Sequence, residues 1–522
     1  MTTRPIISLL LTLILITAGC TSTKSISVQV PEPDYWPTNG WQSSAPEAQG
    51  MDSELLARML EDIAANETNI YSMLVIRNGY LVTEAYFHPY TRDTKMHIQS
   101  VTKSVIGMLV GRAVASGYIK NDELKLSDFY RVDLFENPGQ QKDSIQLKHL
   151  LSMSSGLDCQ EFSGSGPSME QTDGWVKFML NRPMVAAPGE TFGYCNGNAH
   201  LLSAIMEKST GMTAREFANT ELFQPLGIPA ASPGDWWSDP QNITIAGYGL
   251  HLRPVDMAKL AFLSLNNGKW DGEQIIPARW VADSTTEHVQ KEDGSGYGYL
   301  WTVYPEAGHY AALGLGGQQI HVYPSRNLIV IATASLEAYA EAPEIEKMLS
   351  EYILPAIQSD DPLAEDPEGY TRLQSAIEMA ANPVETIPPL PAAALEKSNH
   401  VYTFEENPFG WKTLEFVFEP DEEFAQIILD EIPLRIGLDN VYRASETAQG
   451  YEMLLRGRWV DESTFVLHYP YPLSGMMVLG ELGQSEFRFK FTGDKLEVTV
   501  QQLVFGGEPI VVEGIRSTSE SE

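Results

Sequence analysis

The spacing of apolar residues changes along this chain of 522 residues, and that change limits the folds open to it. Between residues 46 and 357, two β-rich runs are followed by a long region of helical spacing and then by three further strand-like runs. From about residue 394 to 522, apolar residues alternate with polar ones in nearly ten short runs separated by turns. We therefore expect an α+β domain followed by an all-β domain, either an antiparallel barrel or a sandwich.

The sheet of the first domain is expected to form from both ends of its sequence. Asn78-Gly79 stands between two β-rich runs, which is the strongest short signal for a hairpin. The runs "YGYLWTV", "QQIHVYP" and "NLIVIATAS" predict three more strands, and a helix from Pro343 to about Ile357 is expected after them. Residues 358–393, which are rich in Pro, Asp and Glu, predict a linker between the domains.

The N-terminus has the order of an export signal. Arg4 precedes an apolar run from Ile6 to Ile16 that is short for a membrane span, and small residues then lead to Cys20. This order resembles the lipobox of bacterial lipoproteins, in which cleavage leaves a lipidated cysteine; an ordinary signal peptide is the alternative. The resemblance implies a signal peptide over residues 1–20, a flexible tether over 21–45, and attachment of an exported protein to a bacterial membrane. Because no aspartate follows the cysteine, sorting to the outer membrane, on its periplasmic or surface side, is expected.

The composition is strongly acidic, with 69 Asp and Glu against 35 Lys and Arg, giving a formal net charge of −34. Such a chain repels nucleic acid, whose binding needs clustered cations. No phosphate loop, haem motif or metal-ligand spacing is present in the sequence, so no cofactor or metal is expected. After Cys20 only Cys159 and Cys195 remain, and both a disulfide and two buried thiols are open to them.

A serine and a lysine stand three residues apart at the start of a predicted helix, in "SVTK". The hydroxyl of Ser100 is a weak nucleophile that needs a base, and at a helix start it lies near backbone N–H groups that favour an oxyanion. Lys103 would lie on the same helix face among apolar residues, where burial favours a neutral amine able to take the serine proton. An N-cap serine with a solvated lysine is the structural alternative.

Two further motifs carry groups that a serine hydrolase needs. In "GETFGYCNGNAHLLS", Tyr194 could relay a proton, and Asn196 could bind a substrate carbonyl and also the lysine. In "AALGLGGQQIHVYP", Gly317 permits close approach of a ligand, and the N–H of Gln318 could join that of Ser100 as an oxyanion donor. Taken separately, these motifs could also be a capping turn and a glycine-rich hairpin turn.

Taken together and in this order, the motifs resemble the penicillin-recognising serine hydrolases. The resemblance covers about residues 46–357, includes "HLLSMSSGL", "GYGLHLRPVDMAKLAFLSLNNG" and "YGYLW", and favours the branch of class C β-lactamases, esterases and 6-aminohexanoate-dimer hydrolases. It implies a β-lactamase-like antiparallel sheet with a helical region. It also implies that Ser100 is the nucleophile, Lys103 its base, and Tyr194 a second proton-transfer group.

One departure from the family pattern bears on the substrate. Leu315-Gly316-Gly317 aligns with the Lys-Thr-Gly motif, and leucine cannot bind a substrate carboxylate as the family lysine does. The resemblance therefore implies an esterase or aminohexanoate-type amidase that acts on a small-molecule ester or amide through an acyl-enzyme. A β-lactamase or D,D-peptidase, and a non-catalytic surface lipoprotein of the same fold, are the alternatives. The acyl and leaving groups, the oligomeric state and the role of the second domain stay open.

Overall fold

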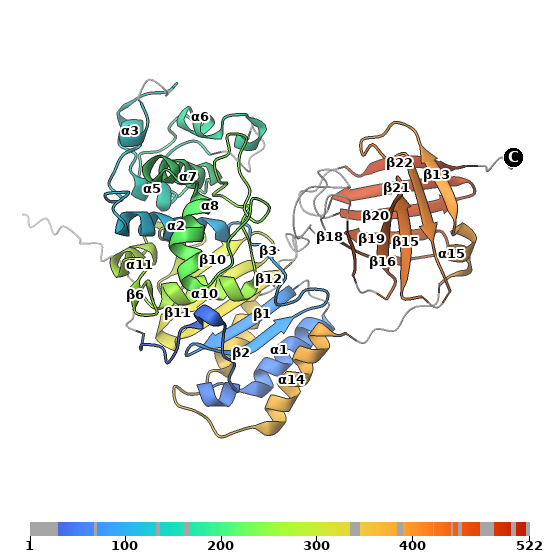
Figure 1. The fold of residues 1–522 in the computed structure, drawn as a ribbon, viewed down its shortest axis with the longest axis horizontal. Helices are drawn as coiled ribbons and strands as arrows, with labels where there is room; N and C mark the ends of the chain where they lie inside the picture. The colour runs from blue at the N-terminus through green and yellow to red at the C-terminus, as the bar shows by residue number, and fades with distance from the viewer. Residues whose placement is uncertain are drawn as a thin grey trace, which may run out of the picture.

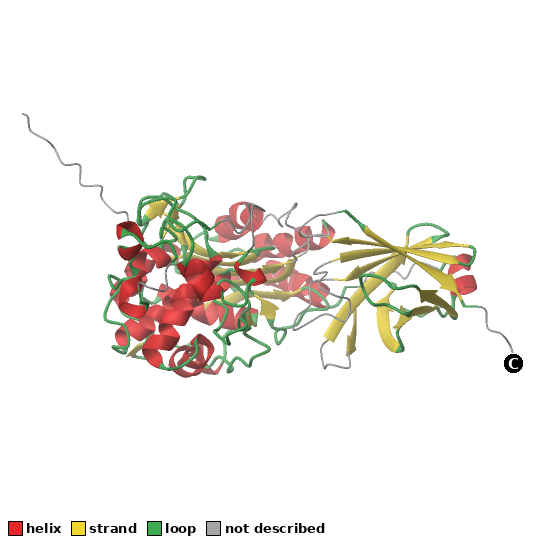
Figure 2. Ribbon diagram, turned by 90° about the horizontal axis from the view of Figure 1, so that it is seen from above, coloured by secondary structure: helices red, strands yellow, loops and turns green. Residues whose placement is uncertain are grey.

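A computed structural model of the chain describes residues 30–66, 70–131, 136–159, 168–334, 345–383, 390–420, 422–439, 442–446, 452–469, 485–502 and 508–517. Its two domains lie side by side, with the second domain to the right in Figure 1 and in the view from above in Figure 2. Cys20 and the rest of the expected signal peptide lie outside the described residues. Within the described residues, no helix combines the length and apolar character that crossing a bilayer requires.

The first domain is built on an eight-stranded sheet with the order β2-β1-β12-β11-β10-β9-β8-β7. The predicted hairpin is confirmed, because β1 and β2 are joined by Asn78 and Gly79, which both have positive φ (52° and 86°). β1 also pairs with β12, so the sheet does form from both ends of the domain. The run "YGYLWTV" differs from the prediction, since it is divided between β8 and β9. The strands are β1 (Ile70–Arg77), β2 (Tyr80–Tyr86), β7 (Val289–Gln290), β8 (Gly296–Tyr297), β9 (Thr302–Tyr304), β10 (His309–Gly314), β11 (Gln318–Tyr323) and β12 (Leu328–Ala334).

Both faces of this sheet are covered, as the apolar character of its central strands requires. In β1, Leu74 and Ile76 pack into the cluster formed with the large helical region, whereas Met73 and Val75 pack into the cluster on the other face. The second cluster involves α1 (Ser53–Ala65), capped by Asp52, and a continuous helical segment of α12 (Ile345–Lys347), a π-helical turn (Met348–Ile353) and α13 (Leu354–Ala356). The domain is therefore a three-layer structure with the sheet in the middle.

The helical layer contains the long helices that the sequence predicts between the two parts of the sheet, with two short strand pairs beside them. Its elements are β3 (Met96–His97), α2 (Val101–Ala115), α3 (Leu126–Phe129), α4 (Gln140–Asp143), α5 (Leu147–Leu151), α6 (Trp175–Leu180), α7 (Asn196–Thr210), α8 (Ala214–Ala218), α9 (Gln224–Leu226), β4 (His251–Leu252), α10 (Pro254–Leu265), β5 (Lys269–Trp270), β6 (Glu273–Gln274) and α11 (Ala278–Ser284). β3 pairs with β4, and β5 pairs with β6.

The segment predicted as a linker is structured over much of its length. It contains α14 (Pro367–Ala381), which lies along α1 in Figure 1. Leu373 of α14 is buried in the same cluster as the apolar residues of α1, and Arg372 forms ion pairs with Glu54 and Glu61 of that helix. α14 therefore belongs to the first domain, and the connection between the domains begins only after it.

The second domain is a barrel, so of the two all-β forms that the sequence left open, the sandwich is wrong. Nine strands follow each other in the order β16-β15-β14-β13-β22-β21-β20-β19-β18, and pairing of Gly437 with Arg456 closes the circle. Phe487, Phe489 and Phe491 point into the core, as their alternation with charged residues predicts. The elements are α15 (Ala392–Lys397), β13 (His400–Phe404), β14 (Thr413–Val417), β15 (Phe424–Leu429), β16 (Ile432–Gly437), β17 (Arg443–Glu446), β18 (Glu452–Trp459), β19 (Thr464–Tyr469), β20 (Ser485–Thr492), β21 (Lys495–Gln502) and β22 (Ile510–Arg516).

The barrel packs on the first domain through a small apolar cluster. Leu454 of β18 is buried against Tyr90 and Met96, with Tyr71 and Tyr442 at the edge of the contact. Met96 belongs to β3, which leads directly to the "SVTK" segment. The barrel therefore contacts the strand from which α2 begins.

Candidate active site

Ser100 lies at the junction between β3 and α2, with its side chain partly exposed. It has helical backbone angles (φ −67°, ψ −9°), and its side chain makes no capping hydrogen bond to the helix. The interpretation of Ser100 as a side-chain N-cap is therefore wrong. The preceding residue, Gln99, has a φ of +50°, which is uncommon for a residue other than glycine and turns the chain sharply from the strand into the helix.

Lys103 is buried one turn into α2, with 1% of its surface exposed, and its amine lies within reach of three oxygen atoms. Its Nζ is 3.0 Å from Ser100 Oγ, 2.6 Å from Asn196 Oδ1 and 2.6 Å from the carbonyl oxygen of Gly247. None of these three acceptors carries a charge. The solvated lysine of the alternative interpretation is therefore wrong, and the amine is held where it can exchange a proton with the serine hydroxyl.

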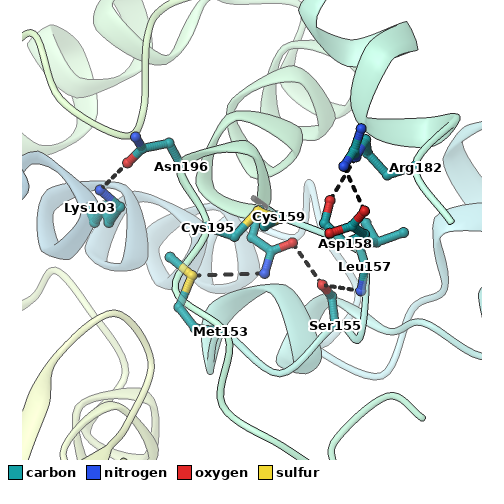
Figure 3. The surroundings of a disulfide bond; sticks show 10 residues. Lys103, Met153, Ser155, Leu157, Asp158, Cys159, Arg182, Cys195 and Asn196 are labelled. Carbon is teal, nitrogen blue, oxygen red and sulfur yellow. Dashed lines mark hydrogen bonds and ion pairs between the residues drawn. A yellow bond between two sulfur atoms is a disulfide. The ribbon is translucent and has the colours of Figure 1, made fainter. Parts of the chain in front are cut away.

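Tyr194 and Asn196 reach the same place from the start of α7. Asn196 is the first residue of that helix and accepts the hydrogen bond from Lys103, as Figure 3 shows. The ring centre of Tyr194 lies 4.6 Å from Lys103 Nζ. Beside it, the buried Tyr297 has a pKa well above its usual value, because burial and the neighbouring Tyr194 both disfavour its anion. The structure thus brings Ser100, Lys103, Tyr194 and Asn196 together, as predicted.

Gly247 is a site residue to which the sequence gave no role. Besides its carbonyl contact with Lys103, a Cβ at this position would lie 2.8 Å from Asn196 Cβ, so no side chain fits there. The signal was present in "GYG", where two glycines flank Tyr248, but the contact spans 144 residues of sequence. Among the residues that the structure describes, no three His, Cys, Asp or Glu side chains gather as a metal site would need.

Gly317 and Gln318 lie in the β10–β11 hairpin, near the serine but without a described contact to it. Gly317 is in the turn, and Gln318 opens β11 and pairs with Gly314. The amide of Gln318 is turned into the hairpin, where it donates to the carbonyl oxygens of Gly316 and Ala334. The hairpin approaches the serine through Gly314, where a Cβ would lie 2.7 Å from the carbonyl oxygen of Ile98. An oxyanion role for Gly317 or Gln318 stays a prediction.

Comparison with known proteins assigns the fold. Residues 57–349, more than half of the chain, match the family model described as Beta-lactamase. The chain belongs to the beta-lactamase family. It is 24% identical to the 6-aminohexanoate-dimer hydrolase of Paenarthrobacter ureafaciens over 310 residues, which are 54% of this chain and 77% of that protein. It is 23% identical to esterase EstB of Burkholderia gladioli over 206 residues, 37% of this chain and 51% of that protein. The solved structure of a penicillin-binding protein homologue from Pyrococcus abyssi covers 88% of this chain and is itself covered to 99%, at 18% identity and a TM-score of 0.46.

The strand motif of this beta-lactamase family member needs a correction. Leu315, Gly316 and Gly317 were aligned with the family's Lys-Thr-Gly strand, but they form the turn after β10. The residues that end the strand beside the serine are Ala312, Leu313 and Gly314. A lysine is absent from both tripeptides, so the lack of a carboxylate-binding cation does not depend on the alignment.

A disulfide bond joins the loop before residue 160 to the tyrosine-asparagine motif of this family member. Cys159 pairs with Cys195, which stands between Tyr194 and Asn196, and their Cα atoms are 5.5 Å apart. Figure 3 shows how the same loop is fixed nearby, where Arg182 forms an ion pair with Asp158 at 2.7 Å. The structure thus decides a point that the sequence left open, and it ties the motif next to Lys103 to a second segment of chain.

Proposed function

We propose that the protein hydrolyses a small-molecule ester or amide through an acyl-enzyme formed on Ser100. The observation that carries this proposal is the 3.0 Å distance between Lys103 Nζ and Ser100 Oγ, with the amine buried and held by two further oxygens. A hydroxyl becomes a useful nucleophile only beside a group that takes its proton, and this lysine is in hydrogen-bonding reach. The names of the relatives, an aminohexanoate-dimer hydrolase and an esterase, support the substrate class.

In the first half of the reaction, Ser100 Oγ forms a bond to the substrate carbonyl carbon while its proton passes to Lys103 Nζ. The negative charge that develops on the carbonyl oxygen needs two N–H donors. Within the described chain, no backbone carbonyl accepts the N–H of Ser100 or that of Leu315, the residue after Gly314. We assign these two groups to the oxyanion, with Leu315 in place of Gln318.

The intermediate then collapses, and the bond between the carbonyl carbon and the leaving group breaks. The leaving oxygen or nitrogen takes the proton from Lys103, directly or through the Tyr194 hydroxyl, whose ring lies 4.6 Å from the amine. Water attacks the acyl-enzyme in the second half, giving its proton to Lys103 and releasing the acid. Ser100 Oγ recovers a proton, so the enzyme returns to its starting state.

The absence of a lysine from the β10–β11 hairpin sets the expected preference among substrates. β-Lactams and peptidoglycan peptides carry a carboxylate, which an apolar Ala312 or Leu315 cannot neutralise. We expect p-nitrophenyl acetate and butyrate to be hydrolysed with a higher kcat/KM than nitrocefin. Faster hydrolysis of nitrocefin would contradict this substrate assignment while leaving the nucleophile untouched.

Labelling with a fluorophosphonate tests the nucleophile directly. We expect one covalent adduct, located at Ser100 by peptide mass spectrometry, and none in Ser100→Ala. Ser104, which also lies in α2 and donates its hydroxyl hydrogen to the carbonyl of Leu300, offers a matched control, because Ser104→Ala should still be labelled. An adduct on any other residue, or an unlabelled folded protein, would refute the assignment and favour a non-catalytic binding protein.

We also propose that Cys20 is lipidated and holds the mature protein to a bacterial membrane. Its support is the order Arg4, apolar run, small residues and cysteine, followed by a polar stretch. Several acyl chains together anchor a protein firmly, at about 0.8 kcal/mol per buried methylene. Wild-type protein should sediment with membranes, and Cys20→Ala should not. Equal distribution of the two proteins would favour an ordinary signal peptide.

A further inference from the structure

His97 is a buried residue three positions before Ser100, and its two ring nitrogens contact two different segments. The ring stacks on His251 at 4.8 Å and lies beside Trp237 at 4.9 Å. The backbone N–H of Gly249 donates to His97 Nε2 at 2.9 Å. The other nitrogen, Nδ1, lies 2.9 Å from the end of the Gln99 side chain.

The contact with Gly249 fixes where the proton of His97 is. A backbone N–H can only donate, so Nε2 must offer its lone pair and carries no proton. Burial and the neighbouring His251 hold the pKa of His97 well below its usual value, so the ring is neutral near pH 7. A neutral imidazole has one N–H group, which must therefore be at Nδ1.

This assignment decides the orientation of the Gln99 amide. With Gln99 Nε2 next to Nδ1, as drawn by the 2.9 Å contact, two N–H donors would face each other. The oxygen and nitrogen of an amide have nearly the same shape, so the hydrogen-bond network decides between them. The amide is therefore turned with Oε1 toward His97, and its NH2 group occupies the second terminal position. That position has no hydrogen-bond partner among the described residues, and Gln99 is partly exposed.

The NH2 group is then a free donor on the residue next to the serine. The two residues before Ser100 serve different sides of the site. Ile98 contacts Gly314 of the β10–β11 hairpin, whereas Gln99 is tied through His97 to the segment of Gly247 and Gly249 that holds Lys103. An acyl group bonded to Ser100 stays beside Gln99 through both halves of the proposed reaction, so this donor is available in each.

We propose that Gln99 is a specificity-determining residue whose outward NH2 group donates a hydrogen bond to a second carbonyl oxygen in the acyl part of the substrate, with His97 as the positioning residue that sets the orientation of its amide. The proposal rests on the proposed function of Ser100. It deepens that function by naming the substrate class as acyl groups that carry a further ketone, ester or amide carbonyl a few bonds from the one attacked.

The first test compares p-nitrophenyl hexanoate with its 4-oxo and 5-oxo forms, which differ only in one ketone oxygen. Wild-type enzyme should prefer an oxo ester in kcat/KM by about tenfold, the upper range for one net hydrogen bond. Gln99→Met should abolish that preference. Gln99→Glu should abolish it too, because a carboxylate still accepts from His97 Nδ1–H but has no NH2 to donate. Both variants keep a Cβ at the strained position, and the ratio between esters removes effects common to both substrates.

The second test reads the orientation without using activity. In protein labelled with 15N-histidine, the signals that disappear in His97→Phe should show protonated Nδ1 and unprotonated Nε2. An Nε2–H tautomer would overturn the proposal, as would equal kcat/KM values for the oxo and plain esters in the wild type. If fluorophosphonate fails to label Ser100, the proposed function falls, while the tautomer measurement still decides the orientation of Gln99.

Discussion

The first domain and the barrel use irregular backbone in different places. In the barrel, Asp430 and Glu431 have positive φ, and they form the tight turn between β15 and β16. In the first domain, Gln99 has positive φ directly before Ser100, and Gly247 leaves no space for a side chain beside Asn196. Strained backbone in a turn serves the connection of strands, whereas strain beside a partly exposed hydroxyl serves a site. The comparison locates chemistry in the first domain and packing in the second.

The largest expected effects come from exchanging one residue in each domain. Ser100→Ala should lower kcat by about 10⁴-fold or more and leave the free energy of unfolding nearly unchanged, because its side chain caps nothing. Phe489→Ala should do the opposite. It removes a side chain from the barrel core and should destabilise the barrel by about 3–5 kcal/mol, with little change in kcat. Ester kinetics and urea unfolding monitored on both variants check the pair. A large fall of kcat in a folded Phe489→Ala protein would end the division of roles.

Acid should separate the domains next. Burial lowers the pKa values of His251 and His309 to about 4 and that of His321 to about 3, all in the first domain. Between those values and about 6.5, the unfolded chain binds more protons than the folded one, so stability falls as the pH is lowered through this window. Each buried histidine should contribute a loss of about 2 kcal/mol by pH 4.5. Urea unfolding at pH 7 and 4.5 should show the first-domain transition moving to lower urea, and a barrel that moves further would contradict this.

Removal of the disulfide should have a smaller effect, confined to the first domain. The Cys159–Cys195 bond closes a loop with a sequence separation of 36, for which chain entropy predicts about 3–4 kcal/mol of stabilisation. Cys159→Ser combined with Cys195→Ser should lower stability by about that amount. It should also lower kcat/KM, because Cys195 lies between Tyr194 and Asn196. Unchanged kinetics in the double variant would show that the helix start holds the motif without the bond.

The smallest effect is expected on removing the barrel. A chain ending at residue 383 keeps α14 and should be labelled at Ser100, with kcat/KM within about tenfold of the full chain, since only the Leu454 contact with β3 is lost. A chain ending at residue 360 should be much less stable, because it lacks Leu373 and the rest of α14. Fluorophosphonate labelling and thermal unfolding compare the two. Loss of labelling in the longer chain would mean that the barrel helps to build the site.

The fold could be predicted where the signal lies within a short stretch of sequence. The hairpin at Asn78-Gly79 and the alternation of Phe487, Phe489 and Phe491 are local patterns, and both are confirmed. The helix α14 was taken as part of a linker because its buried face is narrow and its partner α1 lies some 300 residues earlier in the chain. A short amphipathic pattern shows its role only when its partner is known.

The candidate site divides in the same way. Ser100 and Lys103 could be paired from the sequence because one helical turn fixes their distance. Gly247 and the contact of Gly249 with His97 could not, since these bonds join residues 144 and 152 positions apart. The position of the hairpin motif was also misjudged, because glycines in a strand and glycines in the turn after it look alike in sequence.

The sheet built from both ends of the first domain has a consequence for the order of events during synthesis. The hydroxyl groups of Ser72 and Thr333 lie 2.7 Å apart across β1 and β12, although 261 residues separate them. The barrel closes in the same manner between β13 and β22, but over a much shorter stretch. Contacts this distant in sequence make folding slow. The helix that carries Ser100 is therefore among the first parts of the chain to leave the ribosome, yet it gains its complete sheet only when β12 has followed.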